Sequence, residues 1–205
     1  MMTRGFLPLL ALILAGGAAV LAWETDNFRA FTSTGAQQLE IERTPRTLPD
    51  VQLVDQDGRA FALSGYKGRT VLIDFIFTRC PTVCGILGDD FARMTDLVGG
   101  QLPSTALDLL SISFDPQNDD REALKRYGER FGAAAPHWRI ARTTDRNDLA
   151  ALLKAFGVVI IPDGIGGFIH TSAVYVVDPH GRLAQMLDPE TPPQLFAAAL
   201  RTRAP

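Results

Sequence analysis

Cysteine and histidine are scarce in this chain of 205 residues, which contains two of the former and three of the latter. A zinc site of four Cys and His ligands would need nearly all of them, so no such cage is expected. A basic excess is also missing, because 20 Lys and Arg face 23 Asp and Glu, for a formal net charge of −3. That balance argues against electrostatic binding of nucleic acid. With 46% hydrophobic and 21% charged residues, the sequence is typical of a globular domain with a substantial core.

The N-terminal segment has no charge between residues 6 and 23, which read FLPLLALILAGGAAVLAW. A transmembrane helix typically needs about 20 apolar residues, so this run is at the short end of the range. Arg4 precedes the run and Glu24 follows it, which predicts that the body of the protein lies on the exported side. A secretory signal cleaved after Ala22 is the alternative. We therefore expect residues 1–23 to be a membrane anchor or a signal segment.

The rest of the chain is expected to be a linker or tether over residues 24–47, with an early strand as the alternative, and one domain over residues 48–205. Strands that alternate with helices predict an α/β fold with a mixed sheet flanked by helices. An N-terminal β-hairpin, a central strand that runs into a Cys-bearing turn and helix, and a closing hairpin with a terminal helix form the thioredoxin-like plan. The predicted elements are a hairpin over 51–63 that turns at Asp57-Gly58, strands over 70–77, 107–114, 137–141, 169–177 and 182–187, and helices after Cys80 and over 119–131, 145–156 and 192–201.

The two cysteines lie four positions apart in FTRCPTVC, residues 77–84, directly after the predicted central strand. Residues four apart share one face of a helix, so the sulfurs of Cys80 and Cys84 are placed to bind one metal ion or to form a disulfide. A helix N-terminus also favours thiolate over thiol. A purely structural disulfide, or two buried core cysteines, is the alternative. A bond that closes so short a loop adds little stability, which makes the structural disulfide a weak explanation.

A stable metal site needs a further ligand besides the two thiolates, and the three histidines are the candidates. His180 lies in a turn sequence and is expected to be solvated, and His137 suits a surface or packing position. His170 follows a glycine-rich stretch and begins a strand that, in a thioredoxin-like sheet, lies beside the Cys turn. Thiolates favour copper(I) and imidazole suits either copper oxidation state, although ligand type alone also permits zinc.

Three other classes of protein are alternatives to a metal-binding role. A thiol–disulfide oxidoreductase is favoured by Asp74, which lies six residues before Cys80, where thioredoxins have a buried acid. Burial would raise the pKa of the Asp74 carboxyl unless that carboxyl were paired. A strand-edge residue paired with an Arg is the alternative for Asp74. Against this class, thioredoxins have two residues between their cysteines and no evident need for His170. A peroxiredoxin-like peroxidase would place Thr where this chain has Phe77, and no feature favours an anchored binding module without chemistry.

Three segments together resemble the Sco/SenC family of membrane-tethered, thioredoxin-like proteins of cytochrome oxidase assembly: FTRCPTVC, SFDP at 113–116, and IHTSAVYVVDPHGR from residue 169. The resemblance covers the chain from about residue 48 to its end, together with the N-terminal segment. It implies a copper ion, Cu(I), Cu(II) or both, bound by Cys80, Cys84 and His170. It also implies a partner or redox role for Asp115, for which a helix cap or a turn residue is the alternative.

The same resemblance implies a copper chaperone that delivers copper to the dinuclear site of cytochrome c oxidase, reduces the cysteines of that site, or both. The redox-active pair Cys80 and Cys84 would supply any thiol–disulfide reductase activity. The implied partners are the copper-bearing subunit of the oxidase or another exported cuproprotein, copper donor proteins, and the membrane through the N-terminal segment, with no nucleic acid. The implied location is the exported side of a membrane, the bacterial periplasm facing the inner membrane, with a cleaved soluble form as the alternative.

Overall fold

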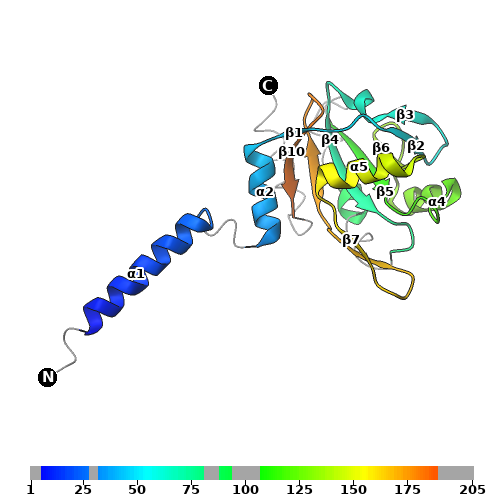
Figure 1. Ribbon diagram of the computed structural model, residues 1–205. Coiled ribbons are helices and arrows are strands. Elements are labelled where there is room, and N and C mark those ends of the chain that lie inside the picture. The colour runs from blue at the N-terminus through cyan, green and yellow to red at the C-terminus, as the bar shows by residue number, and fades with distance from the viewer. Residues whose placement is uncertain (1–5, 28–31, 81–87, 94–106, 189–205) are drawn as a thin grey trace. The chain divides into compact units, whose positions relative to one another are not determined.

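The computed structural model describes residues 6–27, 32–80, 88–93 and 107–188 (Figure 1). The chain is divided into two compact units, Met1–Arg43 and Thr44–Pro205. Of the helix predicted after Cys80, residues 88–93 are described and are helical. Cys84 and the helix predicted over 192–201 lie outside the described residues.

The first unit contains two helices, α1 (Phe6–Glu24) and α2 (Ser33–Arg43). The hydroxyl of Thr32 accepts a hydrogen bond from the Gly35 N–H at 3.0 Å and so supports the start of α2. Among the described residues, we find no helix with both the length and the apolar character that crossing a membrane requires. Helix α2 falls within the range predicted to be a linker.

The second unit is built on a mixed sheet of eight strands in the order β1-β10-β9-β4-β5-β6-β2-β3. Strand β4 is parallel to β5, and β5 to β6, whereas the other neighbouring pairs are antiparallel. This arrangement confirms the predicted α/β fold with a mixed sheet. The strands are β1 (Arg46–Thr47), β2 (Gln52–Asp55), β3 (Ala60–Ala62), β4 (Thr70–Ile76), β5 (Leu107–Ser113), β6 (Trp138–Thr143), β9 (Val174–Val177) and β10 (Arg182–Leu187), with a 3₁₀ helix η1 (Leu63–Tyr66) after β3.

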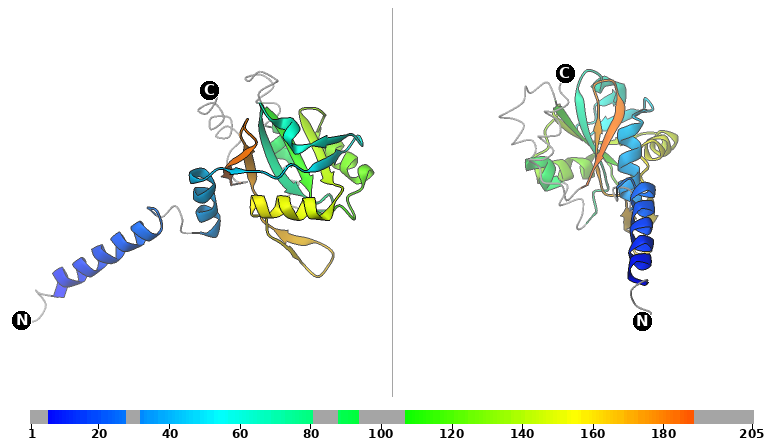
Figure 2. Two further views of the ribbon diagram at one scale, coloured as in Figure 1. Left: turned by 45° about the horizontal axis from the view of Figure 1, so that its top comes forward. Right: turned by 90° about the vertical axis from the view of Figure 1, so that its left-hand side faces the viewer.

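Helices cover both faces of this sheet, as Figure 2 shows from the side. On one face, Phe156 of α5 (Arg146–Phe156) packs edge-on against Phe75 of β4, with ring centroids 5.1 Å apart. On the other face lie α4 (Arg121–Phe131) and helical residues 88–93, where the Phe91 ring is 5.7 Å from that of Trp138. Strands β4 and β5 are buried between these layers over almost their whole length, as expected of central strands.

Local sequence signals predicted both ends of α5 and the end of α4, but not the start of α4. Asp145 caps α5 by accepting hydrogen bonds from two backbone N–H groups, and Gly157 ends the helix in the left-handed region at φ 69°. Helix α4 differs from its predicted start at Asp119, because the capping residue is Asp120, whose carboxylate accepts from the Ala123 N–H at 2.8 Å. Asp119 is instead completely buried.

The single strand predicted over 169–177 is wrong, because the structure has two strands there that belong to different sheets. Strand β8 (Phe168–His170) pairs with β7 (Ile160–Pro162) in a separate hairpin, which projects from the main sheet in Figure 1. The break occurs at Thr171, whose N–H donates to the Val159 carbonyl at 3.0 Å and whose hydroxyl accepts from the Val159 N–H at 3.1 Å. These bonds continue the hairpin and take Thr171 away from the main sheet.

Candidate metal centre

One cavity brings together two of the three predicted metal ligands, Cys80 and His170. Cys80 lies in the turn that leaves the carboxyl end of β4, and His170 is the last residue of β8. Cys80 and His170, which are far apart in the sequence, therefore line one cavity between the end of β4 and the projecting hairpin. The cavity is lined by Phe77, Arg79, Cys80, Asp163, Ile165, Gly166, Gly167, Phe168, Ile169, His170 and Ser172.

The imidazole of His170 is held against aromatic side chains. Its ring centroid lies 4.9 Å from that of Phe114 and 6.1 Å from that of Phe77. Phe168, two residues earlier on β8, packs on the same two phenyl rings at 5.3 and 5.5 Å. The same face of β8 therefore both anchors the hairpin and orients the imidazole.

A hydrogen bond fixes the tautomer of His170. Nδ1 lies 3.0 Å from the carbonyl oxygen of Thr171, which can only accept, so Nδ1 carries the hydrogen. The neutral ring then has its lone pair on Nε2, the atom through which such a histidine binds a metal. Burial lowers the pKa of His170, and the hydrogen bond to Thr171 opposes that effect only in part. The ring is therefore neutral at physiological pH, as a metal ligand must be.

Cys80 is half-buried and is placed by a tight turn, since its N–H donates to the carbonyl of Phe77 at 3.1 Å. Phe77 is itself buried in the aromatic group around His170. Cys84 lies outside the described residues, and within the described ranges no three His, Cys, Asp or Glu side chains gather in a metal-binding cluster. Two soft or borderline ligands therefore face one cavity, and the position of the third predicted ligand is not described.

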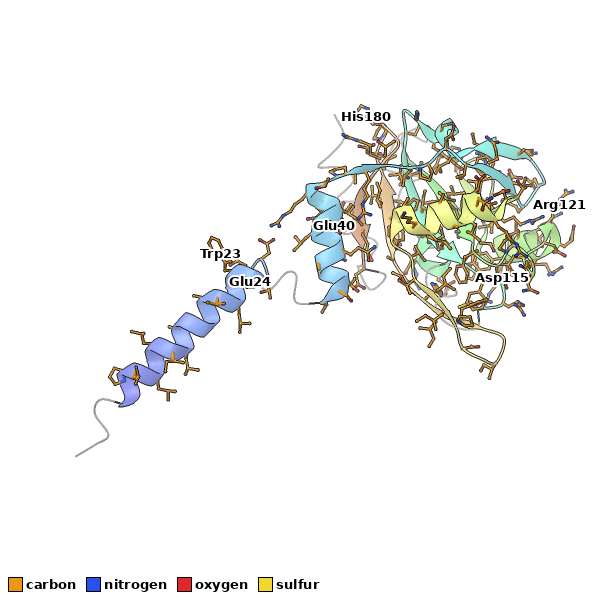
Figure 3. All side chains as sticks on the ribbon, viewed as in Figure 1. Trp23, Glu24, Glu40, Asp115, Arg121 and His180 are labelled. Carbon is orange, nitrogen blue, oxygen red and sulfur yellow. The ribbon has the colours of Figure 1, made fainter. Side chains whose placement is uncertain are left out.

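The other two histidines lie elsewhere. His180 is exposed in the turn between β9 and β10, at the end of the domain away from Asp115 (Figure 3). The side chain of His137, just before β6, is 53% exposed, and its Nδ1 lies 3.5 Å from the buried carboxylate of Asp108. Because strands β4, β5 and β6 are parallel, the amino end of β6, next to His137, is at the other end of the sheet from the carboxyl end of β4, which leads to Cys80.

Asp115 lies beside the cysteine turn, and among the described helices α4 is capped by Asp120 and α5 by Asp145 rather than by Asp115. One of its carboxylate oxygens is 2.9 Å from the guanidinium of Arg79, the residue before Cys80, and Asn118 donates to both oxygens at 2.9 and 3.0 Å. Its carbonyl accepts the N–H groups of Asn118 and Asp119, so it also forms a turn. The Arg79 side chain is half exposed, which limits what this ion pair contributes to stability.

Asp119 contacts the same turn, although sequence reasoning treated it only as the first residue of a helix. It accepts from the Thr78 N–H at 3.0 Å, from the Thr78 hydroxyl at 2.6 Å and from the Ser113 hydroxyl at 2.6 Å. Burial raises the pKa of Asp119, and the hydrogen bonds from Ser113 and Thr78 offset part of that rise. The available signal was the pair of acids before α4, because a helix needs only one N-cap.

Asp74 lies at the centre of β4, opposite Ser111 of β5, and is completely buried. No described residue makes a well-formed hydrogen bond to either carboxylate oxygen, so the predicted alternative of an ion pair with Arg is not found among the described residues. Burial raises the pKa of Asp74 to about 7, against a smaller opposing effect of the Ser111 hydroxyl. Asp74 does not line the cavity of Cys80 and His170.

Comparison with known proteins shows the family of this chain. The model of the SCO1/SenC family matches residues 40–204. The chain belongs to the SCO1/SenC family. The resemblance that the three sequence segments carried is thereby confirmed.

Individual members of the SCO1/SenC family match most of the second unit. The SCO1 protein homolog of Bacillus subtilis is 33% identical over 133 residues, which span 63% of this chain and 67% of the relative. The structure of Bradyrhizobium japonicum ScoI with copper bound matches with a TM-score of 0.66 and 26% identity, over 77% of this chain and 99% of that one. A SCO1/SenC family lipoprotein from Bacillus anthracis matches with a TM-score of 0.69 and 25% identity, over 78% and 97%. Copper, the metal predicted from the sequence, is thus the metal held by a solved relative.

Proposed function

We propose that this member of the SCO1/SenC family binds one copper ion through Cys80, Cys84 and His170 and handles copper during the assembly of cytochrome c oxidase. The observation that carries the proposal is the cavity that Cys80 and His170 share, with the Thr171 carbonyl holding Nδ1 so that Nε2 has the lone pair. The family match and the copper-bound relative support the choice of metal.

The proposed ligand set suits a metal that is received and passed on. Thiolate sulfur binds copper(I) strongly, and an imidazole nitrogen binds both copper oxidation states. Three protein ligands leave a coordination position open, through which a ligand of the acceptor protein enters before the donor's ligands leave. The copper is then cargo, and the aromatic side chains around His170 keep one ligand fixed while the others exchange.

A thiol–disulfide oxidoreductase is the second candidate, and Asp74 is the observation that favours it. A reduced Cys80–Cys84 pair becomes a disulfide by releasing two electrons and two protons, which the disulfide of a partner takes up as it becomes two thiols. A buried carboxyl on β4 whose pKa lies near 7 is able to hold a proton at neutral pH. This reaction requires no metal and no role for His170.

The proposed setting follows the family. Residues 1–23 are the anchor or signal segment, residues 24–47 the tether, whose last residues Arg46–Thr47 join the sheet as β1, and residues 48–205 the copper-binding domain on the exported side of a membrane. A lipoprotein among the solved relatives supports a membrane-attached form. The proposed partners are a copper donor protein and the copper-bearing subunit of cytochrome c oxidase or another exported cuproprotein.

Anaerobic titration with copper(I) against a competing chelator tests the proposal. We expect one copper ion per chain, and an affinity at least about tenfold weaker in His170→Ala, equivalent to about 1.4 kcal/mol. His180→Ala is the matched control, because it removes an exposed imidazole at the other end of the domain and is expected to leave the affinity unchanged. Equal affinities in His170→Ala and the unmodified protein would reject the metal site and favour the oxidoreductase.

A further inference from the structure

The turn that presents Cys80 contacts Asp119 through Thr78 and Asp115 through Arg79. Its hydrogen bond from the Cys80 N–H to the Phe77 carbonyl is internal to the turn and does not connect it to a neighbouring element. A thiol that must meet His170 across a cavity needs its backbone held in place. The question is which group fixes the turn, since a displacement of about 1 Å at a reacting or ligating group carries a large cost.

We propose that Asp119 is the positioning residue of this turn, acting through Thr78 to hold Cys80 opposite His170. Its carboxylate accepts both the main-chain N–H and the side-chain hydroxyl of Thr78, at 3.0 and 2.6 Å. Two bonds to one residue restrict both its position and its rotation. Cys80 follows two residues later, so the thiol inherits that restriction. The significance for metal binding rests on the proposed function, whereas the restraint on the thiol does not.

Asp119 is itself fixed to rigid parts of the molecule. Its N–H donates to the Asp115 carbonyl at 2.9 Å, and its Oδ2 accepts from the hydroxyl of Ser113, the last residue of β5. Ser113 lies opposite Ile76, the last residue of β4, in the parallel ladder. The carboxylate therefore links the exit of β4 to the exit of β5 and to the start of α4.

The burial of Asp119 supports a specific role over a surface contact. Its side chain has no exposure to solvent, and three donors converge on its two oxygens. Helix α4 does not require it, because Asp120 already provides the N-cap. A buried polar group without partners costs free energy, so the Thr78 donors and the carboxylate each depend on the other.

Asparagine at position 119 is able to preserve this geometry, which gives a rescue variant. Its amide oxygen, in the place of Oδ2, accepts from the Thr78 N–H and the Ser113 hydroxyl. Its NH₂ group, in the place of Oδ1, donates to the Thr78 hydroxyl, which then acts as acceptor. Alanine removes all of these contacts, and Thr78→Val removes the one that the hydroxyl makes while keeping the shape of the side chain.

The test measures the alkylation rate of Cys80 by iodoacetamide in a Cys84→Ser background, where it is the only thiol, with copper(I) affinity measured in parallel in the two-cysteine protein. We expect Asp119→Ala and Thr78→Val to alkylate roughly fivefold faster or more, the factor that corresponds to losing about 1 kcal/mol of local restraint. Asp119→Asn is expected to match the parent within twofold. Asp120→Ala, which lowers the unfolding midpoint through the α4 cap, is expected to leave the alkylation rate unchanged.

Three outcomes would overturn the assignment: an unchanged rate in Asp119→Ala, an equal increase in Asp120→Ala, or an Asp119→Asn variant that behaves like Asp119→Ala. The alkylation assay contains no metal, so its result separates the two proposals. Failure of the parent protein to bind copper with the alkylation pattern intact would reject the proposed function and keep the positioning role. Tight copper binding with unchanged alkylation in Asp119→Ala would reject the positioning role and keep the proposed function.

Discussion

At the scale of single residues, the surroundings of His170 decide its chemistry. The sequence offers three histidines, and the fold separates them by exposure, by partner and by the end of the sheet at which they lie. The nearness of His170 to the Cys80 turn was predicted on a strand of the main sheet, whereas the structure reaches it through β8 of a separate hairpin. The bond from Nδ1 to the Thr171 carbonyl was not predictable, because it depends on the turn of the backbone after β8.

Asp119 marks the limit of residue-level prediction. Its neighbour Asp120 behaves as the sequence pattern of a helix start suggests, and the two acids look equivalent in the sequence. Their difference arises because Thr78 and Ser113, which are distant in the chain, end adjacent parallel strands. Contacts of this kind are set by the sheet and leave no periodic signal.

Asp74 gives a prediction for the pH dependence of stability. Its pKa is raised from 3.8 to about 7 in the folded protein, so the folded state keeps a proton that the unfolded chain releases. Stability therefore falls as pH rises from about 4 to about 7, by up to about 4 kcal/mol at roughly 1.4 kcal/mol for each pH unit. We expect Asp74→Asn to remove this slope, so that the variant gains stability relative to the parent between pH 5 and pH 8 in urea unfolding.

Asp50→Asn is the control for that measurement. The Ser64 N–H donates to the Asp50 carboxylate and lowers its pKa, so this carboxyl is ionised in both states above pH 5. The slope between pH 5 and pH 8 is expected to match that of the parent. An Asp74→Asn variant whose stability runs parallel to the parent over this range would contradict the raised pKa.

At the scale of elements, the signals for α5 and for the buried strands β4 and β5 are local and predicted their bounds closely, whereas helix α2 was missed. The cap at Asp145 and the left-handed Gly157 fix α5 within a few residues of each end. Strands β8 and β9 were merged because both are apolar and the break between them depends on Val159, a partner outside the local window. Strand β7 went unnoticed for the same reason, since its pairing within the described part of the chain is with β8.

The cap of α5 gives an element-scale prediction. Asp145→Ala removes the acceptor of the Asn147 and Asp148 N–H groups, and we expect a loss of about 1 kcal/mol in the free energy of unfolding. Asp145→Asn retains an acceptor and is expected to stay within a few tenths of a kcal/mol of the parent. Denaturant unfolding measures both, and equal losses in the two variants would show that the cap does not act through its hydrogen bonds.

At the scale of the whole molecule, the residues of the candidate site lie at one end of the main sheet. The parallel strands β4 and β5 have their carboxyl ends at the same end of the sheet, where the cysteine turn, Asp115 and Asp119 follow them. The α/β class and the mixed sheet were predictable from alternating elements. The full strand order was not, because β1 and β2 reach opposite sides of the sheet through pairings that are remote in sequence.

The proposed pairing of Cys80 with Cys84 gives a prediction for the intact protein. In the metal-free form we expect a reversible disulfide, formed under mild oxidation and opened by a dithiol reductant. Thiol trapping with a mass-tagged maleimide measures it, and two labels per chain are expected after reduction and none after oxidation. Copper(I) added before the oxidant is expected to protect the thiols, and cysteines that stay unlabelled even after reduction would contradict the proposal.

The position of β8 outside the eight-stranded sheet has a consequence for which changes in sequence the domain tolerates. The hairpin of β7 and β8 has its own ladder of three residue pairs and joins the main body through aromatic packing and a turn. Insertions, deletions or substitutions in its tip therefore leave the register of the main sheet untouched. Changes in the hairpin tip can therefore alter the surface around His170 without changing the strand pairing of the eight-stranded sheet.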